Sequence, residues 1–262
     1  MAGVTGVRVG STQLEVDGDG PPIMFIHGLG GTSTSFQPLL EGLAGFRCIR
    51  PDLPGSGRSP SPREAITLTG LAGAVAEILR AIVGSPTHIV GHSMGTLIAQ
   101  HLAASAPEAV ASLTLFGPIG EPADAARERL RDRARLVRQG GMIAVADAVA
   151  AAGLSTATKE ANPIALALVR ELHLRQDAEG FAQSCEALAG AKAADYWAIR
   201  CPTLLVTGED DSVATPSAAQ ALADRIKGAR LKVVARCGHW TPLEQPKECS
   251  RLASDHIRAS AS

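Results

Sequence analysis

The clearest chemical signal in the sequence is a serine held between two glycines. Residues 91–95 read Gly-His-Ser-Met-Gly, after an apolar run typical of a strand and before a pattern typical of a helix. Such a tight turn puts the central serine in a strained backbone conformation, and the glycines let the strand and helix approach closely. Because this turn exposes the hydroxyl at the carboxyl edge of a sheet, we predict that Ser93 is a nucleophile.

A serine hydroxyl is a weak nucleophile at neutral pH and needs a base in contact with it. Of the seven histidines, His239 is the best candidate, because its loop follows the last predicted strand and should reach the same sheet edge as Ser93. The base also needs a carboxylate to orient it. Both Asp210 and Asp211 lie just after the predicted strand at 203–207, at the same sheet edge. We assign Asp211 from its spacing within residues 208–216, with Asp210 as the alternative.

Negative charge on a reacting carbonyl oxygen requires hydrogen-bond donors, here two backbone amides. One predicted donor is the N–H of Met94, directly after the nucleophile, and the other is the N–H of Leu29 in the glycine-rich loop 27–31. This loop lacks the Gly-Lys-Ser/Thr of a phosphate loop and the glycine spacing of a dinucleotide fingerprint. We therefore expect no organic cofactor and no metal ion.

Strand and helix patterns alternate in both halves of the chain, which predicts a mostly parallel sheet covered on both faces. The predicted strands are 23–26, 87–90, 110–116, 203–207 and 230–234, and the predicted helices are 36–43, 68–83, 95–104, 216–227 and 246–258. From residue 117 to about 195 there is no strand pattern. We therefore expect a core formed by residues 1–119 and 196–262, with residues 120–195 as an inserted helical cap.

Composition argues against several classes of partner. The 262 residues are 45% hydrophobic and carry a formal net charge of −1, which favours neither nucleic acid nor an anionic membrane as a partner. No apolar run approaches the roughly 20 residues of a membrane-spanning helix. The five cysteines are scattered, with no CxxC pair, so we expect free thiols and a cytoplasmic protein. The sequence leaves open whether the protein forms a homo-oligomer.

These motifs, together with Asp-Leu-Pro-Gly-Ser-Gly-Arg-Ser at 52–59 and Leu-Glu-Gln-Pro at 243–246, resemble those of the α/β-hydrolase family over almost the whole chain. The resemblance implies the α/β-hydrolase fold: a mostly parallel, eight-stranded twisted sheet flanked by helices, with a helical cap after the sixth strand. Segments 137–149 and 180–187 are most similar to 3-oxoadipate enol-lactonases, which hydrolyse a small carboxylated enol-lactone in bacterial aromatic degradation. Residues 150–154 depart from that group, because Ala-Ala-Ala-Gly-Leu replaces an aromatic-rich segment.

Three residues are candidates for binding the substrate. Trp240 follows His239 and either lines the pocket or packs in the core, while Arg138 and Met142 belong to the cap segment of the resemblance. An acidic substrate could use one of the cap arginines, although most of them should face solvent beside acidic residues.

The residues and the resemblance together predict hydrolysis of a small-molecule carboxylic ester or lactone through an acyl-enzyme. The same three side chains could instead serve a C–C bond hydrolase, a perhydrolase or an acyltransferase, or a ligand-binding receptor built on a hydrolase frame.

Overall fold

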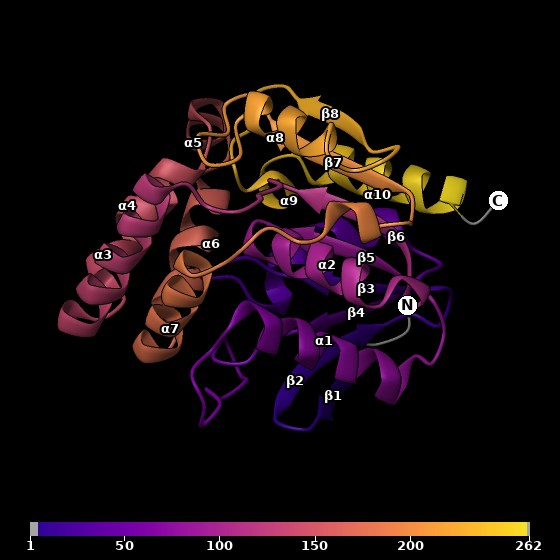
Figure 1. The fold of residues 1–262 in the computed structure, drawn as a ribbon. Coiled ribbons are helices and arrows are strands. Elements are labelled where there is room, and N and C mark those ends of the chain that lie inside the picture. Colours follow the sequence, from indigo (N-terminus) through magenta and orange to yellow (C-terminus); the bar gives the residue numbers. More distant parts are fainter. Residues whose placement is uncertain (1–4, 261–262) are drawn as a thin grey trace.

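The computed structural model describes residues 5–260, and their strands form a single eight-stranded sheet (Figure 1). The strand order is β1-β2-β4-β3-β5-β6-β7-β8. β2 runs antiparallel to β1 and β4, and the remaining pairs are parallel. The strands are β1 (Thr5–Val9), β2 (Thr12–Asp17), β3 (Pro22–Ile26), β4 (Arg47–Pro51), β5 (Thr87–His92), β6 (Val110–Phe116), β7 (Thr203–Gly208) and β8 (Arg230–Val234). This topology confirms the predicted fold class.

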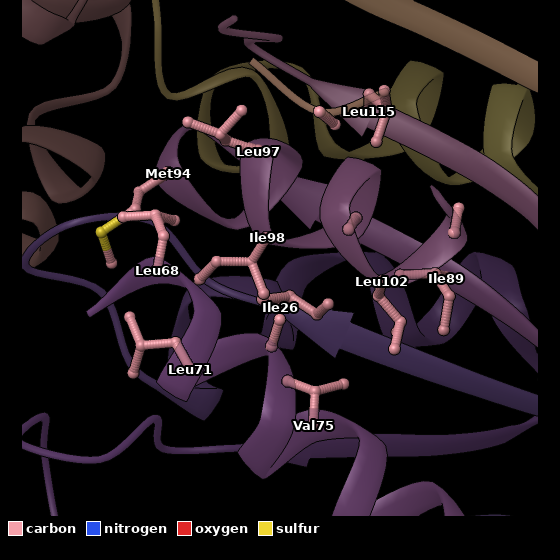
Figure 2. Packing of buried hydrophobic residues seen from close by; sticks show 14 of the residues in the cluster. Ile26, Leu68, Leu71, Val75, Ile89, Met94, Leu97, Ile98, Leu102 and Leu115 are labelled. Carbon is pink, nitrogen blue, oxygen red and sulfur yellow. The ribbon is translucent and has the colours of Figure 1, made fainter. Parts of the chain in front are cut away.

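Alternate residues of the central strands point to opposite faces of the sheet, and each face is covered by helices. In β3, Met24 and Ile26 join the larger core cluster, whereas Ile23 and Phe25 join the smaller one. The larger cluster packs under α1 (Leu68–Ile82), α2 (Met94–Ser105) and α8 (Pro216–Ala223), and Figure 2 shows side chains of α1 and α2 interdigitating with those of the strands. The smaller cluster packs under η1 (Ser33–Leu43) and α10 (Pro246–Ser260). Two short helices are η2 (Pro107–Ala109), which has no buried residue, and α9 (Thr241–Glu244), whose residues are all buried.

The segment between the sixth and seventh strands, which we call the cap, is helical. Between β6 and β7 the chain forms α3 (Asp124–Gly140), α4 (Ile143–Gly153), α5 (Thr156–Ala161), α6 (Pro163–Leu174), α7 (Ala178–Ala189) and the short η3 (Tyr196–Ala198). In Figure 1, α3, α4, α6 and α7 lie together on the side of the molecule away from both ends of the chain. No helix among residues 5–260 is long and apolar enough to cross a membrane.

Two features of the first 45 residues were not predicted. The hairpin of β1 and β2 was not located in the sequence, because half-exposed strands lack the continuous apolar run that marks β3. The segment expected to be an ordinary helix over 36–43 is instead a 3₁₀-helix, η1. Thr32 caps its start, and Pro38 inside it has no amide hydrogen for a regular helical hydrogen bond.

Candidate active site

Ser93 lies in a strained turn between β5 and α2. Its backbone has φ 51° and ψ −120°, a conformation that residues with a side chain rarely adopt. The flanking glycines permit the turn: a Cβ on Gly91 would lie 2.7 Å from the carbonyl oxygen of Gly95, and one on Gly95 would collide with the backbone of Ile26. The sequence therefore holds the Ser93 hydroxyl at the point where β5 ends and α2 begins.

A chain of hydrogen bonds joins Ser93 to His239 and Asp211. The Ser93 hydroxyl donates to His239 Nε2 at 2.8 Å, and His239 Nδ1–H donates to the Asp211 carboxylate, with Nδ1 2.9 Å from Oδ2 and 3.1 Å from Oδ1. This direction places the imidazole proton on Nδ1 and leaves the Nε2 lone pair facing the hydroxyl. All three residues are buried, with exposed fractions of 9% for Ser93, 7% for His239 and 3% for Asp211.

The structure distinguishes sharply between the two neighbouring aspartates. Burial alone would raise the pKa of Asp211, but the nearby His239 and the amides of Val213 and Ala214, which donate to Oδ1, hold that pKa below its ordinary value. The Asp211 carboxylate is therefore ionised beside His239. Asp210 is exposed, and among residues 5–260 only its backbone amide is engaged, with the carbonyl oxygen of Cys237.

The two amides predicted to stabilise an oxyanion are both unused. Within residues 5–260, neither the Leu29 N–H nor the Met94 N–H has a hydrogen-bond acceptor. Gly28, just before Leu29, lies against Ser93, since a Cβ added to Gly28 would be only 2.8 Å from Ser93 Cβ. The loop that contains Leu29 therefore borders the nucleophile. In the same part of the chain, no group of three or more histidine, cysteine or acidic side chains could hold a metal ion.

Two further buried histidines support the loops around Ser93. His27 accepts the Leu53 N–H at Nε2 and donates from Nδ1 to the carbonyl oxygen of Gly28, both at 2.9 Å. His92 donates from Nε2 to the carbonyl oxygen of His239 at 2.9 Å, which ties the nucleophile turn to the loop of the base. Burial, and then the neighbouring His239, lower the pKa of His92 to about 3, so its ring stays neutral.

Glu244 connects the cap to the loop of His239. We did not predict a role for it from the sequence. Its buried carboxylate accepts the backbone N–H of Ser155 and of Gly238 and the Thr158 hydroxyl on Oε2, at 2.8–2.9 Å, and the Trp240 N–H on Oε1 at 3.1 Å. Glu244 belongs to the motif at 243–246, which signals the family but not these partners. Its contacts join the start of α5 to the segment that positions the base.

The three predicted substrate-binding residues differ in their surroundings. Trp240 is buried among apolar side chains of the cap and core, with its ring centroid 4.9 Å from that of His92. Met142 is buried in a cap cluster against which Leu29 packs. Both therefore lie beside segments that form the site.

The surroundings of Arg138 do not favour the substrate-binding role that we predicted for it. Its guanidinium pairs with the carboxylates of Glu179 and Glu186 on α7, and the side chain is 37% exposed. A substrate anion would have to displace one of these carboxylates, so the structure does not favour Arg138 as a substrate ligand. Arg133, by contrast, is partly buried and has no acidic partner within residues 5–260.

Comparison with known proteins identifies the family. Residues 23–252 match the family described as the alpha/beta hydrolase family. The chain belongs to this family. It is 31% identical to a putative carbamate hydrolase, RutD, of Variovorax paradoxus, with 95% of this chain and 97% of the relative covered.

Two other relatives of this α/β hydrolase act on different groups. A pimeloyl-[acyl-carrier protein] methyl ester esterase of Chromobacterium violaceum is 28% identical, with 95% of this chain and 98% of the relative covered. The structure of the enol-lactonase from Burkholderia xenovorans LB400 superposes with a TM-score of 0.88 at 28% identity, covering 97% of this chain and 100% of that one. A carbamate, an ester and a lactone are each hydrolysed at a carbonyl carbon.

Proposed function

We propose that the protein hydrolyses small carboxylic esters or lactones through an acyl-enzyme on Ser93. The observation that carries the proposal is the continuous chain of hydrogen bonds from Ser93 through His239 to Asp211, beside the unused amides of Leu29 and Met94. The esterase and the enol-lactonase among the similar proteins support ester or lactone as the substrate class. The free cysteines Cys48, Cys185, Cys201, Cys237 and Cys249 support our assignment to the cytoplasm.

In the first half of the proposed reaction, Ser93 Oγ attacks the carbonyl carbon while His239 Nε2 takes the hydroxyl proton. The Leu29 and Met94 amides donate to the oxygen that becomes negative, and the Asp211 carboxylate stabilises the imidazolium. The bond to the leaving oxygen then breaks, and this oxygen takes the proton from His239. A lactone opens at this step without releasing a fragment.

In the second half, water attacks the acyl-enzyme and His239 takes one of its protons. The Ser93–acyl bond breaks, the proton returns to Ser93 Oγ, and the carboxylic acid leaves. Every proton moves through His239 Nε2, the atom that faces the hydroxyl. Because the direction of the hydrogen bonds already sets this tautomer, no rearrangement of the imidazole is needed before attack.

The test compares hydrolysis of p-nitrophenyl acetate and of a panel of small lactones by wild type, Ser93→Ala and Ser217→Ala. Ser217 is an exposed serine on α8 and serves as the matched control. We expect Ser93→Ala to lower kcat by at least about 10⁴-fold and Ser217→Ala to leave it unchanged. Wild-type protein that binds these compounds without turning them over would instead indicate a ligand-binding receptor and contradict the proposal.

A further inference from the structure

A buried histidine of the cap, His173, has a nitrogen that the proposed mechanism does not use. His173 lies in the last turn of α6 and is only 1% exposed. Its Nδ1–H donates to the carbonyl oxygen of Val169, one turn earlier, at 2.8 Å. Because the ring proton is on Nδ1, Nε2 carries a lone pair and can only accept a hydrogen bond while the ring is neutral.

The His173 ring lies between two segments that form the site. On one side it meets the loop of Leu29 so closely that any side chain at Gly30 would collide with the imidazole. On the other side it packs edge-on against Trp240, the residue after His239, at a centroid distance of 5.8 Å. Gln176, just after the end of α6, donates to the carbonyl oxygen of Gly30 at 3.2 Å. This bond holds this part of the cap against the loop.

Within residues 5–260, Nε2 of His173 has no hydrogen-bond donor, although it still borders space that water can reach. Burial lowers the pKa of His173 to about 4, and the charge of Arg133 contributes in the same direction. The ring is therefore neutral near pH 7, and Nε2 is an acceptor without a partner in mostly apolar surroundings.

We propose that His173 Nε2 accepts a hydrogen bond from a hydroxyl or amide N–H on the substrate, and so selects esters and lactones that carry such a donor near the carbonyl group. This inference rests on the proposed function, because it assigns the substrate class of the same site. A site built to pair with a substrate donor discriminates against analogues that lack the donor, since the protein group is then left buried and unpaired. The apolar neighbours Trp240 and Phe181 offer an incoming donor no alternative acceptor of comparable strength.

The first test compares three α-substituted γ-butyrolactones, carrying hydroxyl, acetamido or methoxy groups, and unsubstituted γ-butyrolactone. The methoxy compound matches the inductive effect of the hydroxyl but has no proton to donate. We expect wild type to prefer the hydroxyl or the acetamido lactone over the methoxy lactone by about 10- to 100-fold in kcat/KM. The relative rates of the hydroxyl lactone and the acetamido lactone distinguish a hydroxyl donor from an amide donor. Equal rates for all substituted lactones would overturn the inference.

Variants at position 173 provide the second test. His173→Phe keeps a ring but removes the acceptor, so it should lose the preference for the donor-bearing lactones over the methoxy lactone. His173→Gln places an amide oxygen near the position of Nε2 and should retain part of the preference. A phenylalanine variant that folds and keeps the full preference would contradict the assignment, and if it does not fold, the glutamine variant decides.

A readout independent of turnover separates this inference from the proposed function. Calorimetry on Ser93→Ala should show tighter binding of the donor-bearing lactones than of the methoxy lactone, and His173→Phe in that background should abolish the difference. If wild type hydrolyses no ester or lactone, the proposed function is wrong. If it hydrolyses them without preferring donor-bearing substrates, only the role of His173 is wrong.

Discussion

Asp210 and Asp211 are neighbours in sequence but have different environments, and this difference gives a paired prediction. Asp211→Asn should lower kcat for p-nitrophenyl acetate by about 10⁴-fold, because a neutral amide neither stabilises the imidazolium nor fixes the His239 tautomer. Asp210→Asn should leave kcat unchanged, since the Asp210 side chain is exposed. Equal losses in the two variants, or a loss confined to Asp210→Asn, would contradict the assignment of Asp211.

At the residue scale, the sequence predicts a role best where local spacing determines it. Ser93 and Met94 lie in a turn whose glycines are required by close backbone contacts, so the pattern alone indicates their geometry. The contacts of Glu244 and His173 depend on segments about 90 and 140 residues away, which no local pattern specifies. The pairing of Arg138 was missed for the same reason, because its carboxylate partners lie on another helix.

The link between the cap and the His239 loop can be tested through Glu244. Glu244→Gln replaces one acceptor oxygen with a donor facing backbone N–H groups, so we expect the free energy of unfolding to fall by about 2–3 kcal/mol. Because these donors flank His239, kcat should fall as well. Urea denaturation and p-nitrophenyl acetate hydrolysis measure the two effects.

Glu209→Gln is the matched control for this change. Glu209 is also acidic and near the same loop, but it is exposed, and in the described part of the chain its carboxylate accepts only the Arg236 N–H at 3.2 Å. Its substitution should change stability by less than about 0.5 kcal/mol. If both variants are equally stable, Glu244 does not fasten the cap to the loop as described.

At the element scale, most of the parallel strands could be predicted because strands buried on both faces form short apolar runs between turn residues, whereas β4, which begins with Arg and ends with Pro, was not predicted. β3, β5, β6 and β7 follow this pattern. β1 and β2 do not, because their residues are largely partly buried or exposed. The helical nature of the cap could also be predicted, but the placement of its helices depends on contacts between them that the sequence pattern does not encode.

At the scale of the whole molecule, buried neutral histidines determine how stability should respond to pH. Burial lowers the pKa of His27, His88, His92, His173 and His256. In the unfolded chain these histidines take up protons near pH 6.5, while in the folded protein His173 does so only near pH 4 and His92 near pH 3. Between pH 6.5 and pH 4 the unfolded state therefore binds more protons than the folded state. The free energy of unfolding must then fall as the pH falls.

We therefore expect the urea midpoint to decrease steadily from pH 7 to pH 4.5. Asp52 and Asp211 have lowered pKa values, so the stability that they contribute is lost mainly below this window. His173→Phe should show a shallower decrease than wild type, because one of the responsible groups is gone. A midpoint that stays constant or rises on acidification would contradict the neutral state of these histidines.

The central claim is that Ser93 forms a covalent bond to the acyl group, and labelling with a fluorophosphonate tests it most directly. We predict that intact-mass and peptide mass spectrometry will find one phosphonyl adduct per chain, on the peptide containing Ser93, and that ester hydrolysis will be lost in proportion to labelling. Ser93→Ala should take up no label. An enzyme that hydrolyses esters but is labelled at another residue, or remains unlabelled at Ser93 when fully inactivated, would contradict the claim.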